Sequence, residues 1–285
     1  MEHYSAGTLL SHDGLRLNLH CWGDRRGTPL LLLHGGGQTA WAWQATARRL
    51  AVLGYYCLAP DLRGHGESDW AGDGGYGAED FALDARLFAH QAEVPPVAIG
   101  ASLGGMSALL AEAGTGGLFS ALVLVDITPS WEPQGVERIM SFMEAFPDGF
   151  ADLEEAAEAV RRYLPHRARS VRASGLRKNL YQHRNGRWFW RWDPSMLNQA
   201  REMLDHWPPR LEEAAAGLEL PTLLVSGGRS DVVSERTATE FTALVPHAEH
   251  VCIDDAHHMV AGDSNDAFGD AIIKFLTGVS SRKTA

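Results

Sequence analysis

The stretch Val97-Ala98-Ile99-Gly100-Ala101-Ser102-Leu103-Gly104 decides the fold class of this 285-residue chain. It opens with a short apolar run, which is typical of a strand buried on both faces, and residues 103–113 then show helical spacing. Between the two, a G-x-S-x-G pattern places a serine on a tight strand-to-helix turn, where small neighbours let the backbone pass close by. The stretch therefore predicts that the hydroxyl of Ser102 is exposed at the carboxyl end of a buried strand.

Strand and helix patterns alternate on both sides of this turn. An Asp13-Gly14 turn between two short strand patterns predicts an antiparallel hairpin near the start of the chain. We therefore expect an α/β fold with a doubly wound, mostly parallel sheet, right-handed crossovers and an N-terminal antiparallel hairpin. The expected buried strands are residues 30–33, 55–59, 97–100, 122–125 and 222–225, and the expected helices are residues 41–53, 78–90, 103–113 and 267–276.

The alternation stops after the fourth buried run. Residues 127–218 carry helical patterns and many aromatic side chains but no convincing strand run. A connection of this length is not left without structure in a compact domain. Asp152, followed by Glu154 and Glu155, is typical of a helix start. We therefore predict a core formed by residues 1–126 and 219–285 and a helical cap formed by residues 127–218.

The composition indicates an ordinary globular protein. Apolar residues make up 45% of the chain and charged residues 21%, which excludes a disordered or fibrous chain. The first residues lack a basic segment followed by an apolar one, and no apolar run approaches the roughly 20 residues of a spanning helix, so a cytoplasmic protein without a membrane partner is expected. Cys21, Cys57 and Cys252 are widely spaced, which favours reduced thiols. Neither a metal nor a cofactor is predicted.

The charge is unevenly distributed along the chain. The net charge of −11 disfavours a nucleic-acid partner, yet residues 161–192 contain ten Arg or Lys and no Asp or Glu. Three interpretations stay open: a solvated cationic surface, docking on the acidic core through ion pairs, or attraction of substrates that carry a carboxylate.

A second glycine-rich stretch, His34-Gly35-Gly36-Gly37, follows the apolar run at residues 30–33. Glycines at such a position let a backbone N–H approach a developing oxyanion without a Cβ in the way. We predict Gly36 as one oxyanion donor, with Gly35 or Gly37 as alternatives, and the N–H of Leu103 as the other donor.

A serine hydroxyl becomes a useful nucleophile only with a general base and a residue that orients the base. His257 and His258 lie just past the apolar run at residues 251–253, and one of them is expected to be the base. For the acid we predict Asp231, which follows the run at residues 222–225 and its loop. Asp126, which ends the run at residues 122–125, is the alternative in the same layer.

The segment Asp61-Leu62-Arg63-Gly64-His65-Gly66-Glu67-Ser68-Asp69, together with the motifs around Gly36 and Ser102, resembles the α/β-hydrolase superfamily, particularly small bacterial serine esterases and related cofactor-free hydrolases. The likeness spans the chain apart from residues 127–218. The resemblance makes His258 the base, with His257 in the place of the family's usual glycine in His257-His258-Met259. It also supports Asp231, because Arg229-Ser230-Asp231 is similar to the family's acid loop, and it implies a structural role for His65.

The nucleophile type narrows the expected chemistry. Epoxide hydrolases and haloalkane dehalogenases resemble this sequence but carry aspartate at the position of Ser102, so acyl chemistry is expected. The sequence thus predicts a carboxylic-ester hydrolase acting through an acyl-enzyme on a small-molecule ester. Alternatives are a lactonase, a C–C bond hydrolase or a perhydrolase on the same triad, or a non-catalytic ligand receptor. The many aromatic side chains of the insertion favour an apolar or ring-bearing substrate. They are Trp131, Phe142, Phe146, Trp188, Phe189, Trp190 and Trp192.

Overall fold

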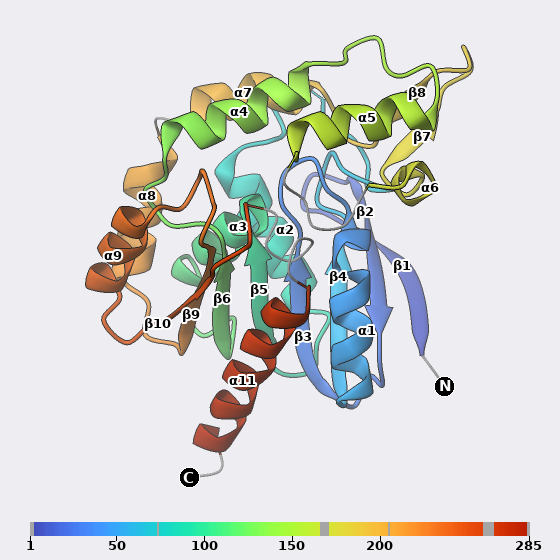
Figure 1. Cartoon of the computed structure of the whole chain (residues 1–285). Helices are drawn as coiled ribbons and strands as arrows, with labels where there is room; N and C mark the ends of the chain where they lie inside the picture. Colours follow the sequence, from blue (N-terminus) through green and yellow to red (C-terminus); the bar gives the residue numbers. More distant parts are fainter. Residues whose placement is uncertain (1–2, 73, 166–170, 205, 259–264, 284–285) are drawn as a thin grey trace.

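The structure is a computed structural model that describes residues 3–72, 74–165, 171–204, 206–258 and 265–283. An eight-stranded sheet in the order β1-β2-β4-β3-β5-β6-β9-β10 forms its centre (Figure 1). The first three strands in that order pair antiparallel and the rest pair parallel, which confirms the predicted fold class and hairpin. The strands are β1 (Tyr4–Leu10), β2 (Arg16–Trp22), β3 (Thr28–Leu33), β4 (Tyr55–Pro60), β5 (Val97–Ala101), β6 (Ala121–Val125), β9 (Thr222–Gly227) and β10 (Glu249–Ile253).

Helices cover both faces of the sheet, as the unbroken apolar runs of its central strands require. Alternate residues of β3 show the division: Leu30 and Leu32 belong to one buried cluster, and Leu31 and Leu33 belong to the other. Figure 1 shows α1 and α11 on the near face. That face carries the 3-10 helix η1 (Ala40–Trp43), α1 (Gln44–Val52) and α11 (Asn265–Lys283), and the other carries α2 (Ala78–Ala89), α3 (Leu103–Ala113), α8 (Trp207–Ala216) and α9 (Glu235–Leu244).

The chain between β6 and β9 is mostly helical. Figure 1 shows α4, α5 and α7 lying across one end of the sheet. Asp152 caps α5, because its Oδ1 accepts the N–H of Glu154 and of Glu155, both at 2.9 Å. The elements before α8 are α4 (Pro133–Glu144), α5 (Leu153–Tyr163), α6 (Ala173–Leu176), β7 (Leu180–Gln182), β8 (Trp188–Trp190) and α7 (Ser195–Met203).

Two features of this segment differ from the sequence-based expectation. Strands β7 and β8 form a small antiparallel sheet of their own, and three residues are too few for a periodic pattern to be read from sequence. Helix α8 packs against α3 and α9, so it belongs to the helical layer of the sheet although it precedes residue 218. Within the described residues, every helix is too short or too polar to cross a membrane.

Candidate active site

Ser102 occupies the turn between β5 and α3 with φ +46° and ψ −117°, a conformation that side chains other than glycine rarely adopt. The flanking glycines explain how the turn closes. A Cβ on Gly100 would lie 2.5 Å from the carbonyl oxygen of Gly104, and one on Gly104 would lie 2.4 Å from that of Leu33. The motif is therefore a steric requirement of the turn, which holds Ser102 at the carboxyl end of β5.

Asp126 occupies the equivalent position on the neighbouring strand. In the parallel β5–β6 pair Ala101 lies opposite Val125, so Ser102 and Asp126 leave the sheet side by side, and the N–H of Ser102 donates to the carbonyl of Val125 at 3.1 Å. The φ of Asp126 is +49°. Across the described residues, Ser102 and Asp126 are the two non-glycine residues with positive φ. Such backbone strain concentrates at functional sites.

The carboxylate of Asp126 contacts the imidazole of His258. Oδ2 lies 2.8 Å from Nδ1, the Asp126 side chain is 0% exposed, and that of His258 is 12% exposed. Oδ1 accepts the N–H of Gly227 at 2.8 Å, and the hydroxyl of Ser230 donates to Oδ2. Because an ionised carboxylate only accepts, Nδ1 of His258 carries the hydrogen and Nε2 has its lone pair free to take a proton.

Asp231, the residue predicted to orient the imidazole, lies elsewhere, and the structure does not bring its carboxylate to His258. Its carboxylate accepts from the guanidinium of Arg138 on α4 at 2.8 Å, and its side chain is 36% exposed. The loop after β9 is pressed against α4: a Cβ on Gly135 would lie 1.9 Å from the carbonyl oxygen of Asp231, and the N–H of Glu132 donates to Val232. This packing turns Asp231 toward the insertion and leaves the neighbouring Ser230 facing Asp126.

The predicted oxyanion donors lie beside Ser102. The N–H of Gly35 donates to Oε1 of Gln38 at 3.1 Å, and the N–H of Gly37 donates to Nε2 of His65 at 3.0 Å. For Gly36 and Leu103, no described residue accepts the backbone N–H. The N–H of Leu103 is at the start of α3, where the helix leaves its first donors free. Both residues line the cavity described below, so they remain the candidate donors.

Buried histidines hold the glycine-rich stretch in place. Burial lowers the pKa of His65 to about 3, so the ring is neutral, and it contacts Arg63 O through Nδ1 at 2.9 Å while accepting from Gly37. Burial also lowers the pKa of His34, whose Nε2 accepts the N–H of Leu62 at 3.0 Å. These contacts support the structural role that the resemblance implies for His65.

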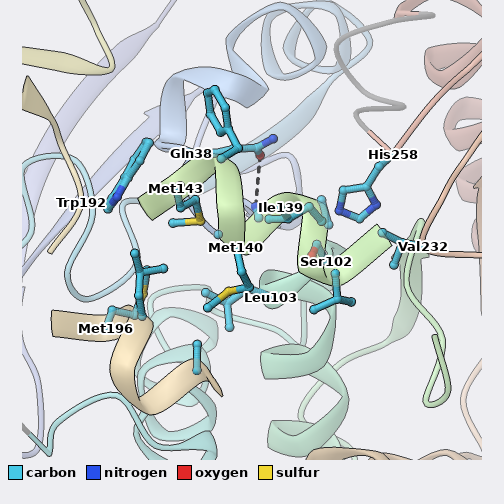
Figure 2. Close-up of a pocket in the computed structure, with 18 of the residues that line it drawn as sticks. Gln38, Ser102, Leu103, Ile139, Met140, Met143, Trp192, Met196, Val232 and His258 are labelled. Carbon is cyan, nitrogen blue, oxygen red and sulfur yellow. Dashed lines mark hydrogen bonds between the residues drawn. The ribbon is translucent and has the colours of Figure 1, made fainter. Parts of the chain in front are cut away.

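A cavity of about 260 Å³ opens at Ser102 and His258. In the view of Figure 2, those two residues lie on one side and Met143 and Met196 lie on the other. None of the described residues that line the cavity is Asp, Glu, Lys or Arg. The lining contains four methionines, Met106, Met140, Met143 and Met196, and four of the seven aromatic residues noted in the insertion, Trp131, Phe142, Trp190 and Trp192.

The two chain neighbours of His258 are His257 and Met259. His257 is not among the residues that line the cavity, whereas His258 is. Met259 lies outside the described residues. The structure therefore places His258 in the wall of the same cavity as Ser102, and no catalytic contact is assigned to His257.

One group of side chains of metal-binding type occurs in the described part of the chain. His12, Asp13 and Asp80 approach one another at the surface. Arg63 pairs with Asp13 at 3.1 Å and with Asp80 at 3.6 Å. Its guanidinium therefore supplies the positive charge beside these carboxylates. The group is accounted for as an ion-pair network.

Comparisons with known proteins identify the family of the chain. Mycobacterium tuberculosis esterase Rv0045c is 31% identical to the chain, over 88% of this chain and 82% of the esterase. A 3-hydroxybutyrate-oligomer hydrolase of Cupriavidus necator is 28% identical, over 87% of this chain and 89% of the relative. The crystal structure of E-2-(acetamidomethylene)succinate hydrolase matches the fold with a TM-score of 0.85 at 23% identity, over 96% of this chain and 100% of that one. Residues 30–271 match the model of the alpha/beta hydrolase family, and the chain belongs to that family.

Proposed function

We propose that this hydrolase-family protein cleaves carboxylic esters through an acyl-enzyme on Ser102, with His258 as general base and Asp126 as the acid that orients it. The observation that carries the proposal is the 2.8 Å contact between His258 Nδ1 and Asp126 Oδ2 beside a serine held in a strained turn. The esterase and hydrolase relatives support the reaction class.

The reaction follows from the free groups of the site. Oγ of Ser102 attacks the ester carbonyl carbon while its proton passes to Nε2 of His258. The N–H groups of Gly36 and Leu103 stabilise the oxyanion. Collapse of the tetrahedral intermediate breaks the bond to the alkoxide oxygen, which takes the proton that His258 received from Ser102 and leaves as the alcohol, and an acyl-enzyme remains. A water molecule then repeats the sequence, releasing the acid and restoring Ser102.

The cavity lining supports uncharged, apolar substrates. An isolated carboxylate taken into such a lining would lose its hydration without gaining a partner. The basic stretch does not change this expectation. Arg161 pairs with Glu154 and Glu158 of its own helix, and Lys178 lies 4.2 Å from the Trp41 ring centroid. No described residue of the basic stretch with a charged side chain lines the cavity.

We also propose that residues 127–218 act as the cap of this site, with α8 as the part that anchors it. Helix α4 contributes Val136, Ile139, Met140, Phe142 and Met143 to the cavity lining. Helix α8 packs against α3, the helix that begins directly after Ser102. The cap therefore supplies most of the apolar contact surface and is expected to set substrate size.

A matched ester panel tests the proposal. Purified protein is assayed with p-nitrophenyl esters of increasing chain length, and with a dimethyl ester against the half ester that keeps one free carboxylate. We expect turnover of the neutral esters, a kcat/KM at least tenfold lower for the half ester, and no dependence of that ratio on salt. A preference for the half ester that decreases with added salt would restore the role of the basic stretch in attracting substrate.

Lactones, ring-cleavage diketones and hydrogen peroxide belong in the same panel, because lactone hydrolysis, C–C bond hydrolysis and perhydrolysis would use the same three residues. Ester binding without turnover would indicate a ligand receptor.

A further inference from the structure

We propose that Ser230 is a positioning residue for this reaction, because its hydroxyl fixes the carboxylate that orients the catalytic imidazole. The inference rests on the proposed function and adds a residue to it. Ser230 lies in the loop after β9, directly before Asp231, and touches neither the substrate cavity nor His258 in any described contact.

The Ser230 hydroxyl accepts two hydrogen bonds, and these restrict the direction in which it can donate its own hydrogen. The oxygen accepts the N–H of Val232 and the N–H of Val233, each at 3.1 Å. Both lone pairs are therefore used by the backbone of the same turn, and the single O–H points to Oδ2 of Asp126. The hydroxyl is a donor of fixed direction.

The bond goes to the carboxylate oxygen that also receives the imidazole proton. Oδ2 of Asp126 accepts from both Ser230 and His258, while Oδ1 accepts from Gly227. Donors on both oxygens fix the plane of the carboxylate, and the carboxylate in turn fixes the ring of His258. Supporting hydrogen bonds of this kind hold a catalytic group in its productive orientation. Without Ser230 the carboxylate keeps the N–H of Gly227 on Oδ1, and on Oδ2 it keeps only the imidazole that it is meant to orient, so no other donor holds Oδ2 in place.

The same loop also explains why Asp231 is not the acid. The turn that presents Ser230 to Asp126 sends the next side chain outward to Arg138. A Ser-Asp pair thus divides two tasks: the serine supports the acid of the site, and the aspartate ties α4 to the loop. Substitutions at the two positions are expected to have different kinetic effects.

The test compares Ser230→Ala with Ser234→Ala. Ser234 lies in the same loop and its hydroxyl also bonds a backbone N–H and a carboxylate, those of Thr237 and Glu132, but it does not contact Asp126. With a neutral p-nitrophenyl ester, Ser230→Ala is expected to lower kcat by about tenfold to a hundredfold with KM within about twofold, as for loss of a bond to a charged group. Ser234→Ala is expected to keep kcat within about twofold, and Ser230→Thr, which retains the hydroxyl, to recover most of the loss.

Unfolding midpoints are measured for every variant, so that kinetics are read on folded protein. A folded Ser230→Ala variant with kcat within twofold of wild type would overturn the proposal. A rise in KM without a fall in kcat would also overturn it, because that result would indicate displacement of Val232 in the cavity wall. An equal fall in kcat for Ser234→Ala would overturn it as well. If Ser230→Ala does not fold, Ser230→Cys decides, because a thiol is a weaker donor of similar shape and is expected to cost at least threefold in kcat. Ser102→Ala distinguishes failure of the proposed function from failure of the proposed role of Ser230. If Ser102→Ala retains activity, the proposed function fails whatever the Ser230 variants show.

Discussion

Nδ1 of His258 lies 2.8 Å from Oδ2 of Asp126, which directly follows β6, and not against Asp231, which lies in the loop after β9. The two strands are neighbours in the sheet, so both aspartates leave it at the same edge. Asp126 directly follows its strand and is buried against the imidazole, whereas Asp231 lies in the loop after β9 and pairs with Arg138 of the insertion.

The two aspartates are expected to respond differently to the same substitution. Asp126→Asn should lower kcat by about three to four orders of magnitude, because an amide neither stabilises the imidazolium nor fixes its tautomer. Asp231→Asn should cost less than about fivefold, since it removes only an exposed ion pair with Arg138. Steady-state kinetics on one ester check both. A larger loss at Asp231 would return the role of the acid to that residue.

Much of this arrangement was predictable from the sequence, but the aspartate that contacts His258 was not. The apolar runs, the Asp13-Gly14 hairpin turn and the Ser102 motif each depend on local chemistry, so the α/β sheet was predicted correctly, and Ser102 lies on the strand-to-helix turn that its motif indicates. Asp126 and Asp231 both follow buried strands and both precede His258, so local pattern does not separate them. The difference arises from a long-range contact, the packing of Gly135 and Arg138 against the loop after β9.

Ser230 and the β7–β8 pair show the same limit. A serine in a polar turn has no sequence signal that tells a support for a catalytic acid from an ordinary turn residue. The helices of the insertion were expected in outline, whereas the side chains that they bring to the cavity depend on how the helices cross the sheet.

The adjacent histidines give a second test. His258→Ala is expected to lower kcat by about three orders of magnitude or more, because the residue that accepts the proton of Ser102 is lost. His257→Ala is expected to keep turnover within about tenfold, since His257 does not line the cavity. Both variants are assayed alongside wild type at the same pH. The opposite ranking would move the base to His257.

The stability of the fold should fall in mild acid through His65. Its pKa is about 3 in the folded protein and about 6.5 in an unfolded chain, so between these values the unfolded state binds more protons. The free energy of unfolding therefore decreases as the pH is lowered through this window, by up to roughly 1.4 kcal/mol per pH unit for one such group.

Urea unfolding of wild type and His65→Asn at pH 7 and pH 4.5 measures this contribution. His65→Asn should be less stable at pH 7, because Gly37 loses the acceptor of its N–H, and should lose less stability than wild type on acidification. His90→Asn, at an exposed position, is the control and should follow wild type. The same pH dependence of the free energy of unfolding in wild type and His65→Asn would show that His65 does not cause the loss of stability in acid.

The central claim is that Ser102 is activated by the pair His258–Asp126, and active-site labelling tests it most directly. Wild type, Asp126→Asn, Asp231→Asn and Ser102→Ala are treated with a neutral aryl phosphonate, and the adduct is followed over time by intact-mass and peptide mass spectrometry. The account predicts one adduct, located on Ser102, absent from Ser102→Ala, at least a hundredfold slower in Asp126→Asn and within about fivefold of wild type in Asp231→Asn. Labelling of another residue, or an Asp126→Asn variant that reacts as fast as wild type while Asp231→Asn does not, would contradict it.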